Sequence, residues 1–290
     1  MHRVWRSTNL TLLALALSAA ASPLGACDAE PAEAPGPQVP EVPEPAPPPD
    51  PADAPSGEAV DVTFRTGDGV TVAATLRPGP VPAAPAVVLV HQLGSTRAEW
   101  APIVERLSAE PGLTTLAIDM RGHGDSRTGP EGTLEWNDFA DAEWAEVVQD
   151  VRAAVDFLRN QETLSPSKIA LAGSSIGSSA AIRLAAEDAD IAAVVALSPG
   201  RAYRGVDAVT PVAEFGDRPL LAVAAEGEPP AAATARDIAR IAAAGEVVLY
   251  PGDAHGLAMI GAAPQMPDRV VTFLRNALGA GAPPHTEDAP

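Results

Sequence analysis

Cysteine and basic residues are scarce in this sequence. Cys27 is the only cysteine among 290 residues, so an intramolecular disulfide is excluded. Lys and Arg together number 19 against 38 Asp and Glu, and the formal net charge is −19. Because phosphate backbones and anionic lipid surfaces both repel such a charge, we expect neither nucleic acid nor anionic lipid as a direct partner.

The N-terminal apolar segment, 10–21, is too short to span a bilayer, which takes about 20 residues. It follows two arginines, as in a secretory signal. The segment runs on to Leu24-Gly25-Ala26-Cys27, which resembles the end of a bacterial lipoprotein signal peptide. We therefore expect 1–27 to be a signal peptide and Cys27 to be the lipidated N-terminus of the mature protein. The lipid would anchor the protein in the cell envelope, at the periplasmic or extracellular face of a bacterial membrane. An ordinary signal with a chance cysteine is the alternative.

Two further segments have the composition of disordered chain. Residues 28–56 hold eleven prolines and seven acidic residues, with no Lys or Arg. Such a linker cannot bury a core, and its prolines favour an extended conformation. The tail, 280–290, is small, polar and proline-containing. One folded domain, 57–279, remains.

Strand and helix patterns alternate through this domain. The segments 60–65 and 70–76 flank Thr66-Gly67-Asp68-Gly69, which is typical of a hairpin. Apolar runs of the buried parallel type follow, at 86–90, 114–118, 168–172, 194–197, 220–223 and 247–250. Helical spacing indicates helices near 138–159, 231–243 and 267–278, and it places Trp144 on the apolar face of the first. This alternation predicts an α/β fold, with a mostly parallel sheet and helices on both faces.

The stretch Gly173-Ser174-Ser175-Ile176-Gly177 has the pattern G-x-S-x-G between the apolar run 168–172 and the helix-forming segment 178–186. A sharp strand-to-helix turn strains the serine backbone, and flanking glycines leave room for the helix. The pattern therefore predicts Ser175 as a nucleophile, with the N–H of Ile176 pointing into the same space. A chance Gly/Ser-rich turn is the alternative.

Three further motifs accompany this elbow, and together they resemble the α/β-hydrolase superfamily over 59–278. They are Val90-His91-Gln92-Leu93-Gly94-Ser95, Asp119-Met120-Arg121-Gly122-His123-Gly124-Asp125-Ser126 and Gly252-Asp253-Ala254-His255-Gly256-Leu257. The resemblance is closest to the small lidless hydrolases around dienelactone hydrolase and related esterases. It implies the α/β-hydrolase fold, with an eight-stranded, mostly parallel sheet. The segment 200–218, where lids usually enter, is too short for a cap domain. Dienelactone hydrolase itself has a cysteine at the elbow, so Ser175 argues against that chemistry.

A serine hydroxyl needs a neighbouring base to act as a nucleophile. His255 lies in a glycine-flanked loop after the last strand, where the family places its catalytic histidine. A surface histidine is the alternative. We expect His91 and His123, in loops after earlier strands, to be structural and to hydrogen-bond loop backbone.

The resemblance places the acid after the strand at 220–223, the one before the last strand, usually as an aspartate before a proline. Glu228, before Pro229, stands at that position and is predicted to orient His255. Glu226 is the competitor, and a third alternative is that neither acts. A second acid position, after the preceding strand, holds Ser198-Pro199-Gly200 and no carboxylate.

The oxyanion hole is expected to combine the N–H of Ile176 with one from the loop after the third strand. Leu93 is predicted by position, with Gln92 as the alternative. Gln92 stands where the family usually has glycine.

These residues predict a serine hydrolase that acts on carboxylic esters with short or exposed acyl groups. A small-molecule ester is the expected partner, and neither a metal nor an organic cofactor is implied. A thioesterase or a peptidase using the same triad is one alternative. A non-catalytic envelope protein that binds a ligand on a hydrolase fold is the other.

Overall fold

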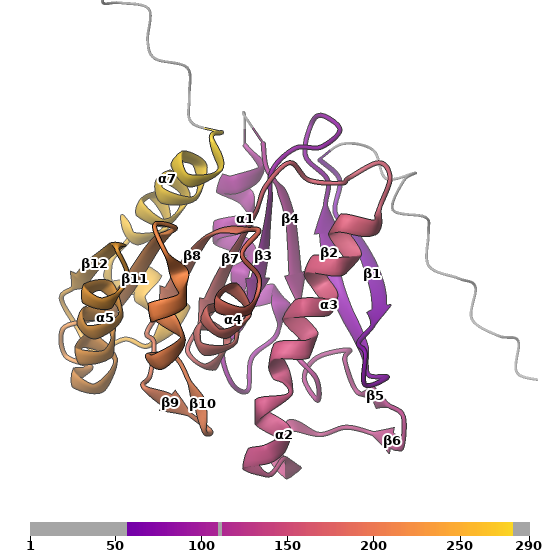
Figure 1. Ribbon diagram of the computed structural model, residues 1–290, viewed down its shortest axis with the longest axis horizontal. Helices are drawn as coiled ribbons and strands as arrows, with labels where there is room; N and C mark the ends of the chain where they lie inside the picture. Colours follow the sequence, from indigo (N-terminus) through magenta and orange to yellow (C-terminus); the bar gives the residue numbers. More distant parts are fainter. Residues whose placement is uncertain (1–56, 110–111, 281–290) are drawn as a thin grey trace, which may run out of the picture. The chain divides into compact units, whose positions relative to one another are not determined.

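The computed structural model describes residues 57–109 and 112–280 (Figure 1). The predicted signal peptide with Cys27, the predicted linker, and all but the first residue of the predicted tail lie outside these residues. In the described part, no helix is long and apolar enough to cross a membrane.

A single large sheet forms the centre of the fold. Its eight longer strands are β1 (Val60–Arg65), β2 (Thr71–Arg77), β3 (Ala86–Val90), β4 (Thr114–Ile118), β7 (Ile169–Ser174), β8 (Ile191–Leu197), β11 (Pro219–Ala225) and β12 (Ala244–Tyr250). Two short strands, β5 (Thr128–Gly129) and β6 (Gly132–Thr133), bring the sheet to ten strands. The eight predicted strands are therefore all present, with two additional short ones at an edge.

The sheet is parallel from β4 to β12. Its order is β12-β11-β8-β7-β3-β4-β2, and β1 pairs with β2. β2 runs antiparallel to both β1 and β4, whereas every pair from β4 to β12 is parallel. The carboxyl ends of β3, β7, β8, β11 and β12 therefore meet at one edge. This arrangement confirms the predicted mostly parallel sheet.

Helices cover both faces of the sheet (Figure 1). Those packed into the larger apolar cluster are α3 (Val147–Asn160), α4 (Ile176–Glu187) and α5 (Pro229–Ile241). The opposite cluster includes α1 (Ala101–Ser108) and α7 (Met266–Leu278). Every residue of β3, β4 and β7 is buried, because helices cover both sides of these strands.

The helix predicted at 138–159 is two helices. α2 (Asp141–Ala145) ends before Glu146, and α3 begins after it. The backbone of Glu146, with φ −79° and ψ −7°, leaves the regular α-helical geometry and separates the two. Trp144 is buried, as its place on the apolar face predicted.

Short elements link the sheet and the helices. They are the 3₁₀ helices η2 (Arg97–Trp100), η3 (Trp136–Asp138), η4 (Thr210–Phe215) and η5 (Gly256–Ala258), and the helix α6 (Met259–Ala262). Between β8 and β11 the chain forms a hairpin of β9 (Ala202–Tyr203) and β10 (Val206–Asp207), followed by η4. This described segment contains no α-helix, so no helical cap lies over the carboxyl edge from it.

Candidate active site

The nucleophile candidate stands on a strained turn between β7 and α4. Ser175 has φ 54° and ψ −119°, a backbone conformation that costs a non-glycine residue free energy. A Cβ at Gly173 would overlap the carbonyl of Gly177, and a Cβ at Gly177 would overlap that of Val90. The glycines are thus required because α4 passes very close to the ends of β7 and β3. The Ser175 N–H donates to the Leu197 carbonyl at 2.8 Å, which fastens the turn to β8.

His255 and Glu228 come together from two other loops at the same edge. His255 follows β12 and Glu228 follows β11, and Nδ1 of His255 forms a short contact with Oε1 of Glu228. Since a carboxylate only accepts, Nδ1 carries the proton, and Nε2 is left with a lone pair that can accept one. The side chain of Glu226 is exposed and forms no hydrogen bond or ion pair with the described residues. The contact with His255 therefore favours Glu228 over Glu226 as the orienting acid.

Ser175 and His255 are not hydrogen-bonded to each other in the structure, which describes both residues. Catalytic hydrogen bonds are often long before substrate binds, so this does not remove either candidate. Ser175 is nearly covered, with 6% of its surface exposed. The His255 side chain is 36% exposed.

Two backbone N–H groups in the loops after β7 and β3 have no acceptor among the described residues. As the first residue of α4, Ile176 has no partner within the helix for its N–H. The Leu93 N–H has no acceptor in the described part of the chain, whereas the Gln92 N–H donates to Glu99 Oε1 at 2.9 Å. The loops that carry them lie side by side, since β3 and β7 are paired neighbours. This difference favours Leu93 over Gln92 as the second donor.

The side chain of Gln92 joins the loops around the site. Its Oε1 accepts a hydrogen bond of 3.2 Å from the Ser174 hydroxyl. A Cβ at Gly256, where φ is +56°, would overlap both of these polar atoms. Gln92 therefore fills the space beside the histidine loop, and this contact together with the positive φ favours glycine at 256.

His91 and His123 hydrogen-bond loop backbone through both ring nitrogens. His91 Nε2 accepts from the Met120 N–H at 2.9 Å, and its Nδ1 faces the Gln92 carbonyl at 2.7 Å. His123 Nε2 accepts from the Gly94 N–H at 3.2 Å, and its Nδ1 faces the Arg121 carbonyl. Burial lowers the pKa of His91 to about 3 and also lowers the pKa of His123. Neither neutral ring has a nitrogen left to serve Ser175.

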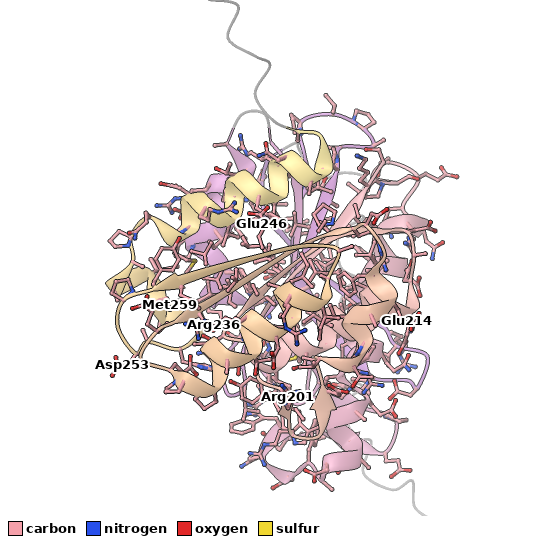
Figure 2. All side chains as sticks on the ribbon, turned by 60° about the vertical axis from the view of Figure 1, so that its left-hand side comes forward. Arg201, Glu214, Arg236, Glu246, Asp253 and Met259 are labelled. Carbon is pink, nitrogen blue, oxygen red and sulfur yellow. The ribbon has the colours of Figure 1, made fainter. Side chains whose placement is uncertain are left out.

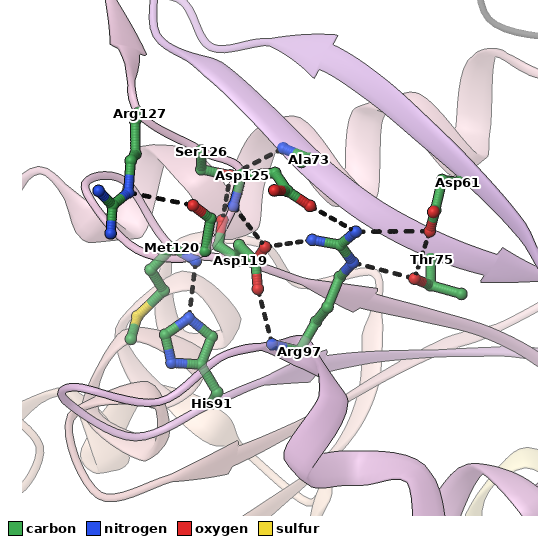
Figure 3. Close-up of polar contacts among 11 residues, drawn as sticks. Asp61, Ala73, Thr75, His91, Arg97, Asp119, Met120, Asp125, Ser126 and Arg127 are labelled. Atoms are coloured by element: carbon green, nitrogen blue, oxygen red, sulfur yellow. Dashed lines mark hydrogen bonds and ion pairs between the residues drawn. The ribbon is translucent and has the colours of Figure 1, made fainter. Parts of the chain in front are cut away.

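The turn after β4 is a buried polar scaffold (Figure 3). Asp119 accepts from the backbone N–H groups of Arg97 at 2.7 Å and Asp125 at 3.0 Å, and it also pairs with the Arg97 guanidinium. A Cβ at Gly124, where φ is +47°, would overlap the Asp119 carboxylate. The 119–126 motif therefore holds loops in place rather than supplying a reactive group.

Three residues beside the site were not found from the sequence. Ser198, at the second acid position, accepts the Gly256 N–H on its hydroxyl at 2.8 Å and so fixes the histidine loop. Glu99 accepts the Gln92 N–H, and burial raises its pKa while hydrogen bonds with Ser95 and the Gln92 backbone oppose the rise. The ring of Tyr203 meets that of His255 edge-on, with 6.0 Å between their centroids. Of these three residues, only Ser198 stands at a position that the sequence had singled out, the second acid position.

Within the described ranges, His, Cys, Asp and Glu side chains form no cluster of three or more that could hold an ion. The arrangement offers instead a serine, a carboxylate-oriented imidazole and two free N–H groups, the set used in acyl transfer.

The family model described as "Serine aminopeptidase, S33" matches residues 82–255. That match covers more than half of the chain and extends from β3 to His255. The chain belongs to the serine aminopeptidase S33 family. By family and fold it is an α/β hydrolase, as the sequence motifs predicted.

Individual proteins similar to this S33 family member include one curated relative and several solved hydrolase structures. The quorum-quenching protein AidA of Acinetobacter baumannii is 30% identical over 141 residues, which are 48% of this chain and 43% of AidA. The matched region thus spans less than half of that relative. An esterase of Pyrococcus furiosus, Pf2001, superimposes with a TM-score of 0.61 at 22% identity, covering 76% of this chain and 91% of the esterase. A dienelactone hydrolase of Anabaena variabilis gives 0.60 at 21% identity, covering 78% and 99%. These likenesses of structure show the α/β-hydrolase fold.

Proposed function

We propose that the protein is a serine hydrolase of carboxylic esters with short or exposed acyl groups. The single observation that carries the proposal is the pairing of His255 Nδ1 with Glu228 at the same sheet edge as a strained Ser175. A strained backbone of this kind persists only where the surrounding structure holds it, and such residues cluster at active sites.

The proposal gives each group a role. Ser175 attacks the ester carbonyl, and His255 Nε2 takes the serine proton and returns it to the departing alcohol. Glu228 holds the imidazole in the required tautomer and stabilises the imidazolium. The N–H groups of Ile176 and Leu93 bind the oxyanion of the tetrahedral intermediate. Water then hydrolyses the acyl-enzyme by the same route in reverse order.

A short acyl preference follows from the segment between β8 and β11. It consists of the β9–β10 hairpin and η4, so it offers little apolar surface to close over a chain. Each methylene buried in a tunnel contributes about 0.8 kcal/mol, and without a tunnel that gain is missing. We expect acetate to butyrate esters to be the best of a p-nitrophenyl series.

The central test is Ser175→Ala in the full-length protein, kept in detergent. We expect turnover of p-nitrophenyl acetate to fall by several orders of magnitude while circular dichroism is unchanged. Labelling by a fluorophosphonate probe should disappear in the same variant. Retention of more than about a tenth of the wild-type rate, or an unlabelled wild type, would favour a non-catalytic binding protein.

Peptide hydrolysis is the second candidate, because the matching family model is described as a serine aminopeptidase. The same serine, imidazole and oxyanion donors serve esters, thioesters and amides. A panel of one ester, one thioester and one aminoacyl peptide with a common acyl group separates these activities. A kcat/KM highest for the aminoacyl peptide would replace the ester proposal.

We also propose that Cys27 carries a lipid that anchors the enzyme in the bacterial cell envelope. The support is the sequence Leu24-Gly25-Ala26-Cys27 after an apolar segment. An exported, anchored hydrolase with an open site would meet small esters that reach the envelope from outside.

A further inference from the structure

Tyr203 lies beside all three residues of the proposed triad. Its ring packs edge-on against His255, with 6.0 Å between ring centroids and an interplanar angle of 83°. Burial raises the pKa of the phenol, the nearby charge of Glu228 adds to the rise, and interaction with the Ser175 hydroxyl acts in the opposite direction. Tyr203 therefore borders the space between the nucleophile and the base.

The hairpin that carries Tyr203 is fastened at several points. Arg201, next to the hairpin in Figure 2, forms an ion pair with Asp237 of α5. The Arg204 guanidinium lies 5.8 Å from the centre of the Trp144 ring. A Cβ at Gly200 would overlap the Tyr203 ring, so the ring is packed directly on the backbone there. These contacts hold the phenol at a defined place beside the site.

Among the described residues, the phenol hydroxyl has no acceptor at ordinary hydrogen-bond length. Its hydrogen bond goes to the Ser198 carbonyl at 3.4 Å, whereas O–H···O bonds are usually about 2.7–2.8 Å. Tyr203 is half-buried, and burial is the main cause of its raised pKa, so the group stays protonated near neutral pH. A half-buried donor with a weak partner is available to a better acceptor.

The leaving group of the substrate supplies that acceptor. In the proposed mechanism His255 returns its proton to the departing oxygen, so this oxygen must lie next to the imidazole. The Tyr203 ring lies against the same imidazole. We propose that Tyr203 is a further active-site residue whose phenol donates a hydrogen bond to the leaving-group oxygen of the ester. This inference rests on the proposed Ser175 hydrolase function.

Departure of the leaving group causes no chemical change at Tyr203. When the tetrahedral intermediate collapses, the bond between carbon and the leaving oxygen breaks and its electron pair stays on that oxygen. The proton on His255 Nε2 moves to the same oxygen and yields the alcohol. Tyr203 keeps its proton, and its hydrogen bond stabilises the negative charge that develops while the bond breaks.

The test is Tyr203→Phe in the full-length protein, which removes only the hydroxyl and keeps the packed ring. The measured quantity is kcat/KM, because it reports acylation, for p-nitrophenyl, phenyl and ethyl acetate. A nitrophenolate departs without help, whereas an alkoxide needs stabilisation. We expect p-nitrophenyl acetate to lose less than about threefold and ethyl acetate about ten- to a hundredfold.

Tyr250→Phe is the matched control, since the chain has only two tyrosines and Tyr250 is buried in the apolar cluster of the opposite sheet face. This variant should leave the dependence of kcat/KM on the leaving group as it is in the wild type. If Tyr203→Phe lost kcat/KM equally on all three esters, or lost none on ethyl acetate, the inference would be wrong even though Ser175→Ala was inactive. Activity retained in Ser175→Ala would instead remove the proposed function itself.

Discussion

Replacing Glu228 by glutamine should impair hydrolysis strongly without unfolding the protein. The substitution keeps the size of the side chain and removes its charge. Oε1 contacts His255 Nδ1, while Oε2 is buried and has no partner among the described residues. A glutamine NH₂ in place of Oε1 would face Nδ1 and reverse the tautomer. In place of Oε2 it would be a buried donor without an acceptor, which costs about 1–3 kcal/mol. Both orientations are therefore unfavourable.

The size of the expected loss in kcat depends on how exposed the side chains of Glu228 and His255 are. Loss of the acid from a well-formed triad lowers turnover by about 10⁴. Here the side chains of Glu228 and His255 are 20% and 36% exposed, so water stabilises part of the imidazolium charge. We therefore expect a loss of about 10²–10³ in kcat, or about 2.7–4.1 kcal/mol of activation free energy.

The assay compares Glu228→Gln and Glu226→Gln with wild type on p-nitrophenyl acetate. Circular dichroism and a urea melt establish that each variant is folded. Glu226→Gln is the matched control, because the Glu226 side chain is exposed and lies only two residues away. If it proved the more damaging, the acid would be misassigned. If neither variant lost more than about threefold, Ser175 and His255 would work without an orienting carboxylate.

Three further predictions follow from other parts of the chain. Gly256→Ala should lower kcat/KM by at least about tenfold, because the new Cβ would overlap the side chains of Gln92 and Ser174 at a φ of +56°. If the variant kept the kinetics of the wild type, this loop would not be rigid. Cys27→Ser should move the protein from the membrane to the soluble fraction and remove the lipid mass from the intact protein; unchanged fractionation would reject the anchor. His91 is buried with a pKa of about 3, so the unfolded chain binds the extra proton below pH 6.5 and stability falls as pH falls. Between pH 7 and pH 5 this group should lower the free energy of unfolding by about 2 kcal/mol, and His91→Gln should flatten that part of a urea-melt series; an unchanged slope would count against it.

The strands could be predicted because burial on both faces leaves a continuous apolar run. β3, β4 and β7 are buried at every position, and each was visible as such a run. The break at Glu146 was not visible, since Trp144 and Val147 keep the apolar spacing on both sides of it. Periodicity reports which face is buried, and it is insensitive to one residue that leaves helical geometry.

For the site, sequence motifs located loops more easily than they distinguished neighbours within a loop. The G-x-S-x-G pattern singles out Ser175 by its place between Gly173 and Gly177, and His255 is the only histidine in its motif. Glu226 and Glu228, by contrast, differ by two positions in one turn. Leu93 and Gln92 are adjacent, and the choice between them depends on the Glu99 carboxylate, which takes the Gln92 N–H. Such choices depend on side-chain contacts between elements, which no local pattern encodes.

The hairpin that carries Tyr203 could not be recognised from the sequence. Its hairpin turns at Arg204 and Gly205, which have φ of 49° and 79°. A two-residue turn with two positive φ values is usually recognised from Asn-Gly or Asp-Gly, and arginine at its first position hides the signal. The contact of the Arg204 guanidinium with Trp144 offsets part of the cost of that backbone conformation. Arg204, which hides the hairpin signal in the sequence, therefore helps to hold the hairpin in place, and with it the Tyr203 ring that packs against His255.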